Sequence, residues 1–208
     1  MKVSVKDVEK YYNKSAHDMN HVLRVYKNSL RIAEKEDCDI EVVKAAALLH
    51  DIARHLDEYS DKLCHAEEGA KMAEKILQNY DYTPVQVRNI VHSIRVHRYS
   101  KGLKPETIEA KILQDADRLD ALGAIIVARV FYSRGTDKGV MYDPKIKPEK
   151  KYKGAASSKT AINHFYEKIL KITPDTFHTK IGCELANNRY DFTKKFVEQF
   201  IKEWNCEI

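Results

Sequence analysis

The sequence Ala45-Ala46-Ala47-Leu48-Leu49-His50-Asp51-Ile52-Ala53-Arg54 decides the fold. An apolar helix leads directly into an adjacent histidine and aspartate, and an arginine follows one turn later. Burying such a pair without a partner is costly, so a compensating charge is expected beside it. A divalent metal ion would supply that charge, because imidazole and carboxylate together suit Mn, Fe, Co, Ni or Zn, and carboxylate-rich sites also accept Mg. For this pair taken alone, the alternative is that both side chains face solvent.

The composition indicates one ordinary globular domain. The chain has 208 residues, of which 43% are hydrophobic and 32% charged, and we predict a single domain over residues 1–208. Seven glycines and five prolines leave little room for a turn-rich β fold, so we predict an all-α helical bundle. No apolar run approaches the ~20 residues of a membrane span, and residues 1–7 lack the apolar segment of a signal peptide.

The cysteines indicate the cellular compartment of the protein, and the net charge indicates which class of partner it binds. Cys38, Cys64, Cys183 and Cys206 are scattered without metal-ligand spacing, which favours free thiols in a reducing cytoplasm. The net charge of +5 could attract a phosphate-bearing molecule but is no signature of nucleic-acid binding. We therefore predict a cytoplasmic protein whose partner is a phosphorylated small molecule. Neither a membrane nor a nucleic acid is predicted as a partner, and a homodimer is left open.

Helical periodicity covers most of the chain. The final helix is expected to carry a core stripe of aromatic residues from Phe192 to Trp204, and the one before it to be capped by Ser157 or Ser158. The predicted helices span residues 4–12, 16–36, 40–55, 65–80, a segment that begins at Thr83-Pro84, 105–131 as one long helix, a segment around 158–168, and 176–204.

The second helix carries a polar stripe. His17, His21, Arg24 and Asn28 follow one another at intervals of four, three and four residues, so they share one helix face. Asp18 lies three residues before His21 and could fix the tautomer of its ring. The alternative is that both histidines lie on the surface near the helix start.

Arg54 and the next helices supply further candidates for ligand binding. Arg54 could clamp a phosphate oxygen, or could form a surface salt bridge of little value. His65 and Glu68 are three residues apart and could face one cleft, although exposed positions suit them equally. His92 and His97 are five apart and diverge by about 140° on a regular helix, so they cannot both hold one metal ion. We favour His97 as the residue facing the cleft.

Asp117 stands where the long helix over 105–131 becomes apolar. Its second half is predicted to be buried on most faces. Asp115 and Arg118 are expected to point away from the side of Asp117. A carboxylate that leads into a buried helix needs a cation, and His50 and Asp51 supply the other half of such a site. Asp117 shares its face with Leu113, Asp120, Ala121 and Ala124.

Residues 133–157 are the least regular part of the chain, and we predict an irregular basic loop there. A loop of this length is usually functional or disordered, and its lysines with Tyr142 and Tyr152 could form a lid over a phosphorylated ligand. A solvated loop is the equal alternative. The lysines are Lys145, Lys147, Lys150, Lys151 and Lys153.

Taken together, His21, the pair His50-Asp51, and Asp117 lie on three predicted helices of one bundle. Two histidines and two carboxylates inside a bundle make a divalent site with open positions for water or substrate. In this H…HD…D pattern the chain resembles the HD-domain superfamily of metal-dependent phosphohydrolases. Residues 17–25, 111–124 and 163–168 resemble the YedJ/YpgQ-like group more closely, and the resemblance extends from about residue 11 to 204.

The resemblance implies an HD-type helical bundle in which His21, His50, Asp51 and Asp117 are the metal ligands. It also implies hydrolysis of nucleoside triphosphates to monophosphate and pyrophosphate, typically with Mn²⁺. Such an ion would lower the pKa of bound water to about 7 and polarise a phosphoryl oxygen. One ion is the simpler count, and a second helped by His65, His92 or His97 stays open.

Other residues are assigned roles in this reaction as expectations. Glu68 or Asp120 would relay a proton, beside Asp51 and Asp117 in the catalytic centre. Substrate contacts are expected from Arg24, Arg54, His97, His164 and Lys168, the last two lying four residues apart on one helix face.

Two other classes of function remain open from the sequence. A phosphodiesterase or 5′-nucleotidase could use the same site. A non-catalytic module could sense a metal or nucleotide, or bind RNA through residues 145–153, although an aromatic stacking platform of the RNA-binding type is missing there.

Overall fold

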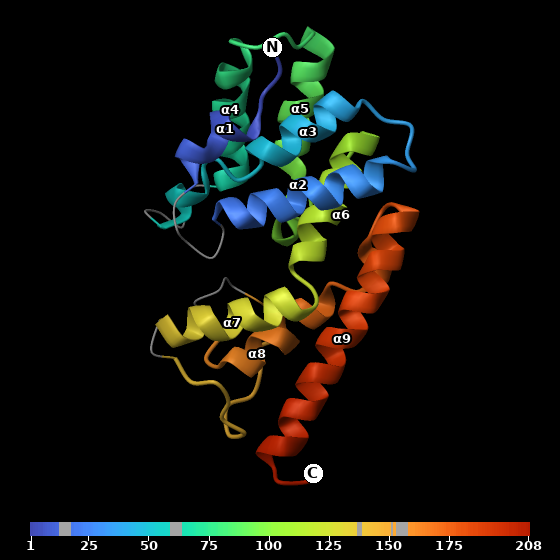
Figure 1. Cartoon of the computed structure of the whole chain (residues 1–208). Helices are drawn as coiled ribbons and strands as arrows, with labels where there is room; N and C mark the ends of the chain where they lie inside the picture. The colour runs from blue at the N-terminus through green and yellow to red at the C-terminus, as the bar shows by residue number, and fades with distance from the viewer. Residues whose placement is uncertain (13–17, 59–63, 137–138, 151, 153–157) are drawn as a thin grey trace. The chain divides into compact units, whose positions relative to one another are not determined.

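The computed structural model describes residues 1–12, 18–58, 64–136, 139–150, 152 and 158–208 (Figure 1). Over these residues every regular element is a helix, and the β structure is confined to one isolated parallel bridge between Val140 and Thr160. The all-α prediction is therefore confirmed. The chain separates into two compact units, Met1–Arg118 with His178–Gly182, and Leu119–Phe177 with Cys183–Ile208. That residues 1–208 form one domain stays a prediction.

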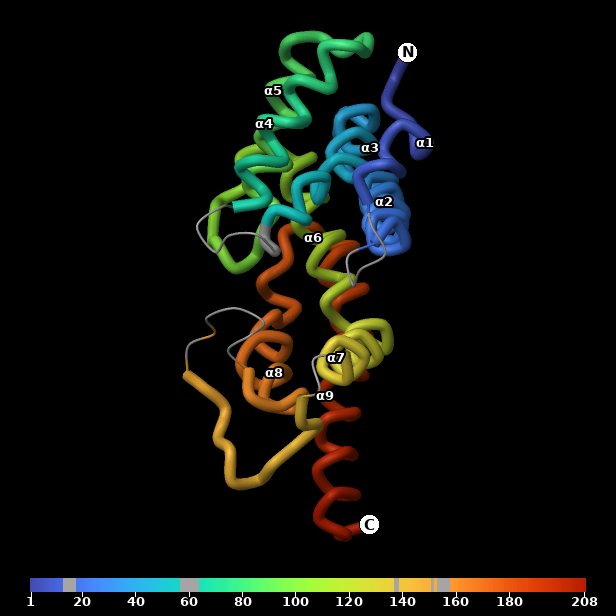
Figure 2. Tube along the Cα trace, turned by 90° about the vertical axis from the view of Figure 1, so that its left-hand side faces the viewer, coloured from blue at the N-terminus to red at the C-terminus, as the bar shows by residue number. Residues whose placement is uncertain are grey.

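The first unit is a bundle in which α2 packs on α3, α3 on α5, and α4 on α5. The pairs α2–α3 and α4–α5 lie side by side in both views (Figures 1 and 2). Its interior is closed by fully buried small and branched residues, among them Ala45, Ala46 and Leu49 of the segment quoted first. Its elements are α1 (Val5–Val8), η1 (Glu9–Tyr11), α2 (Met19–Ala33), α3 (Ile40–Leu49), η2 (Arg54–Glu58), α4 (His65–Leu77), α5 (Pro84–Val96), η3 (Tyr99–Lys101) and α6 (Ile108–Asp120), whose last two residues, 119 and 120, belong to the second unit.

Side-chain caps explain where several of these helices begin. Asp39 accepts hydrogen bonds from the backbone N–H groups of Glu41 and Val42, which caps α3. Thr83 and Gln86 form a reciprocal capping box in front of α5, with Pro84 in the first turn as predicted. Each cap satisfies backbone donors that lack a partner within the helix.

The predicted helix over 105–131 is wrong as a single element. The structure has two helices, α6 and α7 (Ala124–Thr136), because the chain turns at Gly123, whose φ is +84°. Only glycine adopts this backbone region without strain. The N–H of Gly123 donates to Thr193 Oγ1 at 2.8 Å, and an added Cβ would lie 3.3 Å from Arg189 Cγ. The second half is also less buried than predicted, since Ile125 and Tyr132 are 48% and 70% exposed.

Gly123→Ala should lower the free energy of unfolding by about 1–2 kcal/mol, because alanine is strained at positive φ. The matched control is Gly135→Ala in α7, where φ is not positive and an added Cβ meets nothing within 4 Å. That control should leave stability unchanged or slightly raised, since alanine is the better helix former. Urea unfolding of both variants checks the prediction, and equal stabilities would contradict it.

The second unit is built around phenylalanines. Phe131 of α7 lies 5.8–6.2 Å from the rings of Phe165, Phe196 and Phe200, measured between centroids. The predicted stripe in the last helix is confirmed only in part, because Phe192 and Trp204 are 48% and 44% exposed. The remaining elements are α8 (Ala161–Glu167), η5 (Ile169–Lys171), η6 (Pro174–Thr176) and α9 (Lys180–Trp204), whose first three residues, 180–182, belong to the first unit.

Helix boundaries in this part of the chain differ from the prediction. Thr160, not Ser157 or Ser158, caps α8 by accepting a hydrogen bond from the N–H of Asn163. The last helix begins at Lys180 and not at Thr176, because residues 174–176 form a separate 3₁₀ turn that starts with Pro174. A shift of the α8 cap by a few residues is expected, since several serine and threonine side chains precede this helix and each could cap it.

The basic loop predicted over 133–157 is shorter, because α7 continues through Thr136. Lys145, Lys147 and Lys150 are exposed. Lys151 and Lys153 lie outside the described residues, so a lid over a ligand stays a prediction.

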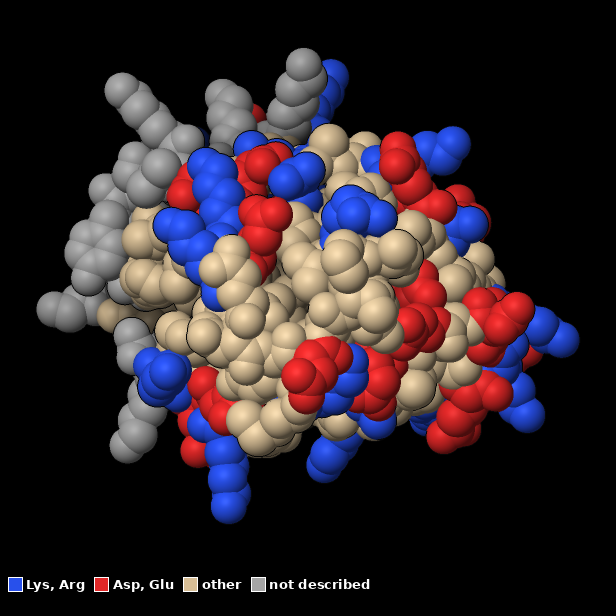
Figure 3. Space-filling view, turned by 90° about the horizontal axis from the view of Figure 1, so that it is seen from above, with Lys and Arg blue, Asp and Glu red and all other residues tan. Residues whose placement is uncertain are grey.

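The surface carries charges of both signs. On the face drawn in Figure 3, Lys and Arg side chains lie beside Asp and Glu side chains rather than gathering by sign. Among the described helices, none combines the length and apolar character needed to cross a bilayer.

Candidate metal centre

The start of α2 places His21. Asp18 caps this helix, and its carboxylate accepts hydrogen bonds from the backbone N–H groups of Asn20 and His21 at 3.0 and 3.2 Å. The prediction that Asp18 fixes the ring tautomer of His21 is therefore corrected: Asp18 holds the backbone of His21, not its ring. His17 lies outside the described residues.

The end of α3 places His50 and Asp51. The helix predicted over 40–55 ends at Leu49, and His50 is its C-cap. A tighter turn follows, in which the N–H of Arg54 donates to the carbonyl of Asp51 at 2.9 Å. Tyr12, which the sequence analysis did not single out, donates its hydroxyl proton to the carbonyl of Leu48 at 2.7 Å and so satisfies one of the last carbonyls of the helix.

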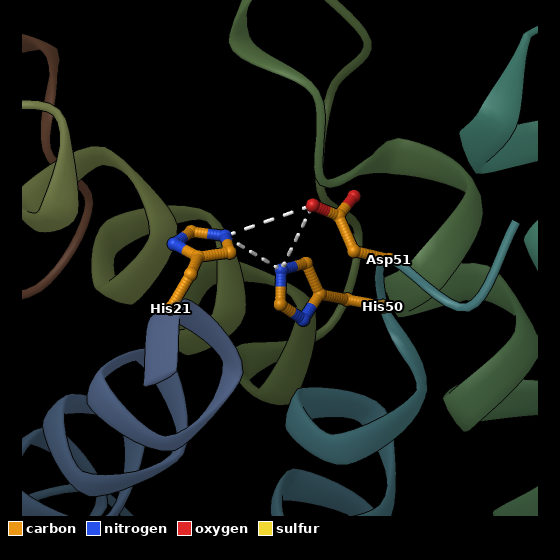
Figure 4. A group of neighbouring side chains, drawn as sticks. All are labelled: His21, His50 and Asp51. Atoms are coloured by element: carbon orange, nitrogen blue, oxygen red, sulfur yellow. Dashed lines mark hydrogen bonds and ion pairs between the residues drawn. The ribbon is translucent and has the colours of Figure 1, made fainter. Parts of the chain in front are cut away.

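The four predicted metal ligands come together in the first unit. Figure 4 shows the His21 ring pointing from α2 toward His50 and Asp51. His21 Nε2 lies 3.3 Å from His50 Nε2, 3.6 Å from Asp51 Oδ2 and 3.6 Å from Asp117 Oδ1. The two histidines and Asp51 are buried, whereas the Asp117 side chain is 25% exposed. The cluster is therefore enclosed on most sides and reaches solvent next to Asp117.

A second group of ligand-type atoms shares Asp51 with the first. Asp51 Oδ1 lies 3.4 Å from His65 Nε2 and 3.4 Å from His97 Nε2, and both histidines are buried. His65 begins α4 and His97 is the C-cap of α5. Of the two histidines weighed from the sequence, His97 lies beside Asp51, whereas His92 Nε2 accepts a hydrogen bond from the backbone of Glu106. The role of His97 as a substrate contact stays a prediction.

The sequence did not decide whether His65 faces the cleft or solvent, and in the structure it lies beside Asp51. The signal that could have found it is its place four residues before the buried Gly69 and eight before the buried Ala73, on the inward stripe of α4.

Backbone carbonyls orient two of the rings. The carbonyl of Ala47 lies 2.9 Å from His50 Nδ1, and that of Ile94 lies 2.6 Å from His97 Nδ1. A carbonyl only accepts, so each Nδ1 carries a proton and each Nε2 turns toward Asp51. This is the arrangement found for histidines that ligate metal ions through Nε2.

Burial and the Asp51 charge set the protonation of the site. Burial lowers the pKa of His50 to about 4, so its ring is neutral near pH 7. Burial alone would raise the pKa of Asp51, but His50, His97 and Arg54 outweigh it and hold that pKa well below the usual range. Burial alone would lower the pKa of His97, but the hydrogen bond and charge of Asp51 raise it. Without a bound cation, the Asp51 carboxylate and the neighbouring imidazole nitrogens thus compete for protons.

The donor set fits a divalent metal ion. Neutral imidazole nitrogens and carboxylate oxygens are the ligands preferred by Mn, Fe, Co, Ni and Zn. Here His21 Nε2, His50 Nε2 and Asp51 Oδ2 face one another within 3.8 Å, and each can accept a positive partner.

The remaining predicted residues of the first unit lie on its helices. Arg54 Nη1 lies 3.3 and 3.1 Å from the two ring nitrogens of His65. Arg24 lies one turn after His21 on α2. Glu68 accepts a hydrogen bond from Lys71 Nζ at 2.8 Å on the partly exposed side of α4. Its role in proton transfer stays a prediction.

Three predicted residues belong to the second unit. Asp120 is buried and accepts a hydrogen bond from Arg129 Nη1 at 2.9 Å. His164 Nδ1 lies 3.0 Å from Ser158 Oγ, and Lys168 Nζ lies 5.2 Å from the centre of the Tyr152 ring. Their roles as proton relay and substrate contacts stay predictions.

His164 should make stability depend on pH. Burial, with the positive charge of Lys168, lowers its pKa to about 3, against 6.5 in the unfolded chain. Below pH 6.5 the unfolded chain therefore takes up a proton that the folded chain refuses, and stability falls as the pH falls toward 3. Between pH 6.5 and 5 the loss should be about 2 kcal/mol. Urea unfolding at both pH values, with His164→Asn as the comparison, measures it. An equal loss in the variant would contradict the assignment to His164.

Comparison with known proteins places this geometry in context. Residues 19–122 match the family described as HD domain. The chain is 31% identical to the Bacillus subtilis protein YpgQ over 91% of its own length and 85% of that protein.

Two solved structures resemble the chain over nearly its whole length. An HD-superfamily hydrolase from Bacillus thuringiensis matches with a TM-score of 0.73 and 35% identity, covering 97% of this chain and 93% of the other. The structure of Bacillus subtilis YpgQ in complex with ADP matches with a TM-score of 0.72 and 27% identity, covering 96% and 92%.

Proposed function

Since the chain belongs to the HD-domain family of metal-dependent phosphohydrolases, we propose that it hydrolyses nucleoside triphosphates to the monophosphate and pyrophosphate. We further propose His21, His50, Asp51 and Asp117 as the ligands of a divalent ion, manganese before Mg, Fe, Co, Ni or Zn. When bound, the ion would acidify water and polarise a phosphoryl oxygen.

The observation that carries the proposal is the buried cluster around Asp51. Imidazole nitrogens of His21 and His50 converge on one carboxylate oxygen, and the carbonyl of Ala47 orients the His50 ring. Burial keeps the His50 ring neutral, which is the form that binds metal ions. The partly exposed Asp117 leaves an approach for substrate on its side.

The choice of a nucleotide as substrate rests on a relative. The YpgQ structure that resembles this chain was solved in complex with ADP, which supports a nucleotide ligand here. In this chain, Arg54 would neutralise phosphate charge from a position next to His65. The four cysteines are free thiols, which supports a cytoplasmic location.

Product analysis tests the proposal. Each of a panel of nucleotides is incubated with the protein and Mn²⁺, Mg²⁺, Co²⁺ or Ni²⁺, and the products are separated by chromatography. Monophosphate and pyrophosphate from a triphosphate would support the proposal. Inorganic phosphate from a monophosphate would instead identify a 5′-nucleotidase, and RNA affinity without turnover would identify a binding module.

A further inference from the structure

Tyr12 contacts the end of α3 next to the metal cluster. Its hydroxyl donates a hydrogen bond to the carbonyl of Leu48 at 2.7 Å. The backbone N–H of Asp51 in turn acts as a hydrogen-bond donor to the Tyr12 oxygen. Because a hydroxyl can donate and accept at the same time, this one group links the backbone on either side of His50. Burial and the charge of Asp51 raise the pKa of Tyr12, so the hydroxyl keeps its proton near pH 7.

The carbonyl of Leu48 faces Tyr12 because the helix tightens at this point. In a continuous α-helix, that carbonyl would accept a hydrogen bond from the N–H of Ile52, four residues later. Ile52 instead donates to the carbonyl of Leu49 at 3.3 Å, as in a 3₁₀ turn. The Tyr12 hydroxyl therefore replaces a helical hydrogen bond where α3 ends.

The hydrogen bond from Asp51 to Tyr12 bears on the His50 ring. In a continuous helix, the N–H of Asp51 would donate to the carbonyl of Ala47. That carbonyl lies 2.9 Å from His50 Nδ1 and orients the ring, so that Nε2 turns toward His21. Because the Tyr12 oxygen accepts from Asp51, the Ala47 carbonyl can serve the imidazole. Tyr12 thereby supports the orientation of two neighbouring side chains of the cluster.

The segment that carries Tyr12 is held in place by its own packing. Val3 and Val8 are buried, and the N–H of Val3 donates to Tyr82 Oη at 3.2 Å. Helix α1 packs on α3, the helix whose end Tyr12 contacts. The residues that match the HD-domain family begin at 19, so this contact comes from outside the matched region. A packed segment thus delivers the hydroxyl to the metal cluster.

We propose that Tyr12 is a positioning residue of the metal centre, which holds the backbone of Asp51 so that both carboxylate oxygens reach their histidines. Oδ2 lies 3.6 Å from His21 Nε2, and Oδ1 lies 3.4 Å from the Nε2 atoms of His65 and His97. A functional site tolerates displacements of only about 0.5 Å, and because the aspartate side chain is short, a shift of its backbone moves both oxygens. The inference rests on the proposed function, because it assigns a supporting residue to that same site.

The test is Tyr12→Phe, which keeps the ring and removes the hydroxyl. Mn²⁺ alone is titrated into the full chain by calorimetry, and urea unfolding of the metal-free protein measures stability. Tyr12→Phe should bind Mn²⁺ about tenfold more weakly, an effect typical of residues that support metal ligands. It should also lose some stability, because the backbone groups of Leu48 and Asp51 lose this hydrogen-bond partner.

Tyr190→Phe and Tyr82→Phe are matched controls, because each removes one hydroxyl that bonds to the backbone away from the cluster. The Tyr190 hydroxyl donates to the carbonyl of Leu170 at 3.2 Å, and that of Tyr82 accepts from Val3. Each control should lose some stability but bind Mn²⁺ as the wild type does. Wild-type affinity in Tyr12→Phe, or an equal loss of affinity in Tyr82→Phe, would overturn the proposal. Failure of Tyr12→Phe to fold would overturn it as well, since the hydroxyl would then support the whole unit and not the site.

These measurements separate the two proposals. If Mn²⁺ binding depends on Tyr12 as expected but no triphosphate is cleaved, the proposed function fails and the inference stands. If triphosphates are cleaved while Tyr12→Phe binds Mn²⁺ like the wild type, the inference fails and the proposed function stands.

Discussion

Asp51→Asn should lower kcat/KM for the best nucleotide at least ~10³-fold, equivalent to about 4 kcal/mol of transition-state stabilisation. Asp51 contributes to both groups of ligand-type atoms, with Oδ2 facing His21 and His50, and Oδ1 facing His65 and His97. Asparagine keeps the shape of the side chain but removes its charge. The variant should therefore lose its manganese along with its activity.

Manganese content, turnover and circular dichroism are measured on the same preparation of Asp51→Asn. Helical content should stay near that of the wild type, because Asp51 follows the end of α3 and does not lie within a helix. Asp191→Asn, on the exposed side of α9, is the matched control and should retain both metal and turnover. The double change His50→Ala with Asp51→Ala should behave like Asp51→Asn. Retained manganese and turnover in either variant would refute the site.

Asp115→Asn should lower the free energy of unfolding by about 3 kcal/mol, an effect on stability rather than on chemistry. Asp115 is fully buried, and its carboxylate accepts hydrogen bonds from the backbone N–H groups of His178 and Thr179 and from the Thr179 hydroxyl at 2.7–3.1 Å. An amide nitrogen at one of these positions would face donors with a donor. The carboxylate also leaves no room at Gly182, where a Cβ would lie 2.5 Å from Asp115 Oδ2.

Asp117→Asn is the control for this prediction, since it changes the same residue type two positions later on α6. Its side chain is 25% exposed and faces His21, so the variant should lose metal affinity with little loss of stability. Gly182→Ala should destabilise the fold in the same sense as Asp115→Asn. Thermal unfolding of the metal-free proteins checks all three. Equal stability of Asp115→Asn and the wild type would contradict the role given to Asp115.

Asp115 also shows where helical periodicity was insufficient. The pattern correctly indicated that Asp117 faces the cluster, because residues on one helix share a face with their neighbours three and four positions away. It predicted that Asp115 and Arg118 point elsewhere. They do, but both are buried, since another part of the same unit, residues 178–182, packs there. Periodicity within one helix carries no information about a partner more than sixty residues away.

The sequence by itself determined the fold class and most helices, and it grouped the four residues that meet in the buried His/Asp cluster. The features that allowed this are local in the sequence: apolar spacing, caps such as Thr83 with Pro84, and charged residues that lead into buried helices. Each of them reflects a backbone or burial preference of neighbouring residues, so it can be recognised without the tertiary structure. His21, His50, Asp51 and Asp117 could be grouped because each lies on, or directly after, a helix whose inward face was readable. The Gly123 break was missed because a single glycine is tolerated in many helices.

Only the tertiary structure decided which of the polar side chains meet. The contact of Arg54 with His65, the sharing of Asp51 between two groups, and the four hydrogen bonds to Asp115 all join residues that different elements bring together. Such contacts depend on the packing of buried faces from the whole unit. No local preference of the chain encodes the distance between two side chains on different helices.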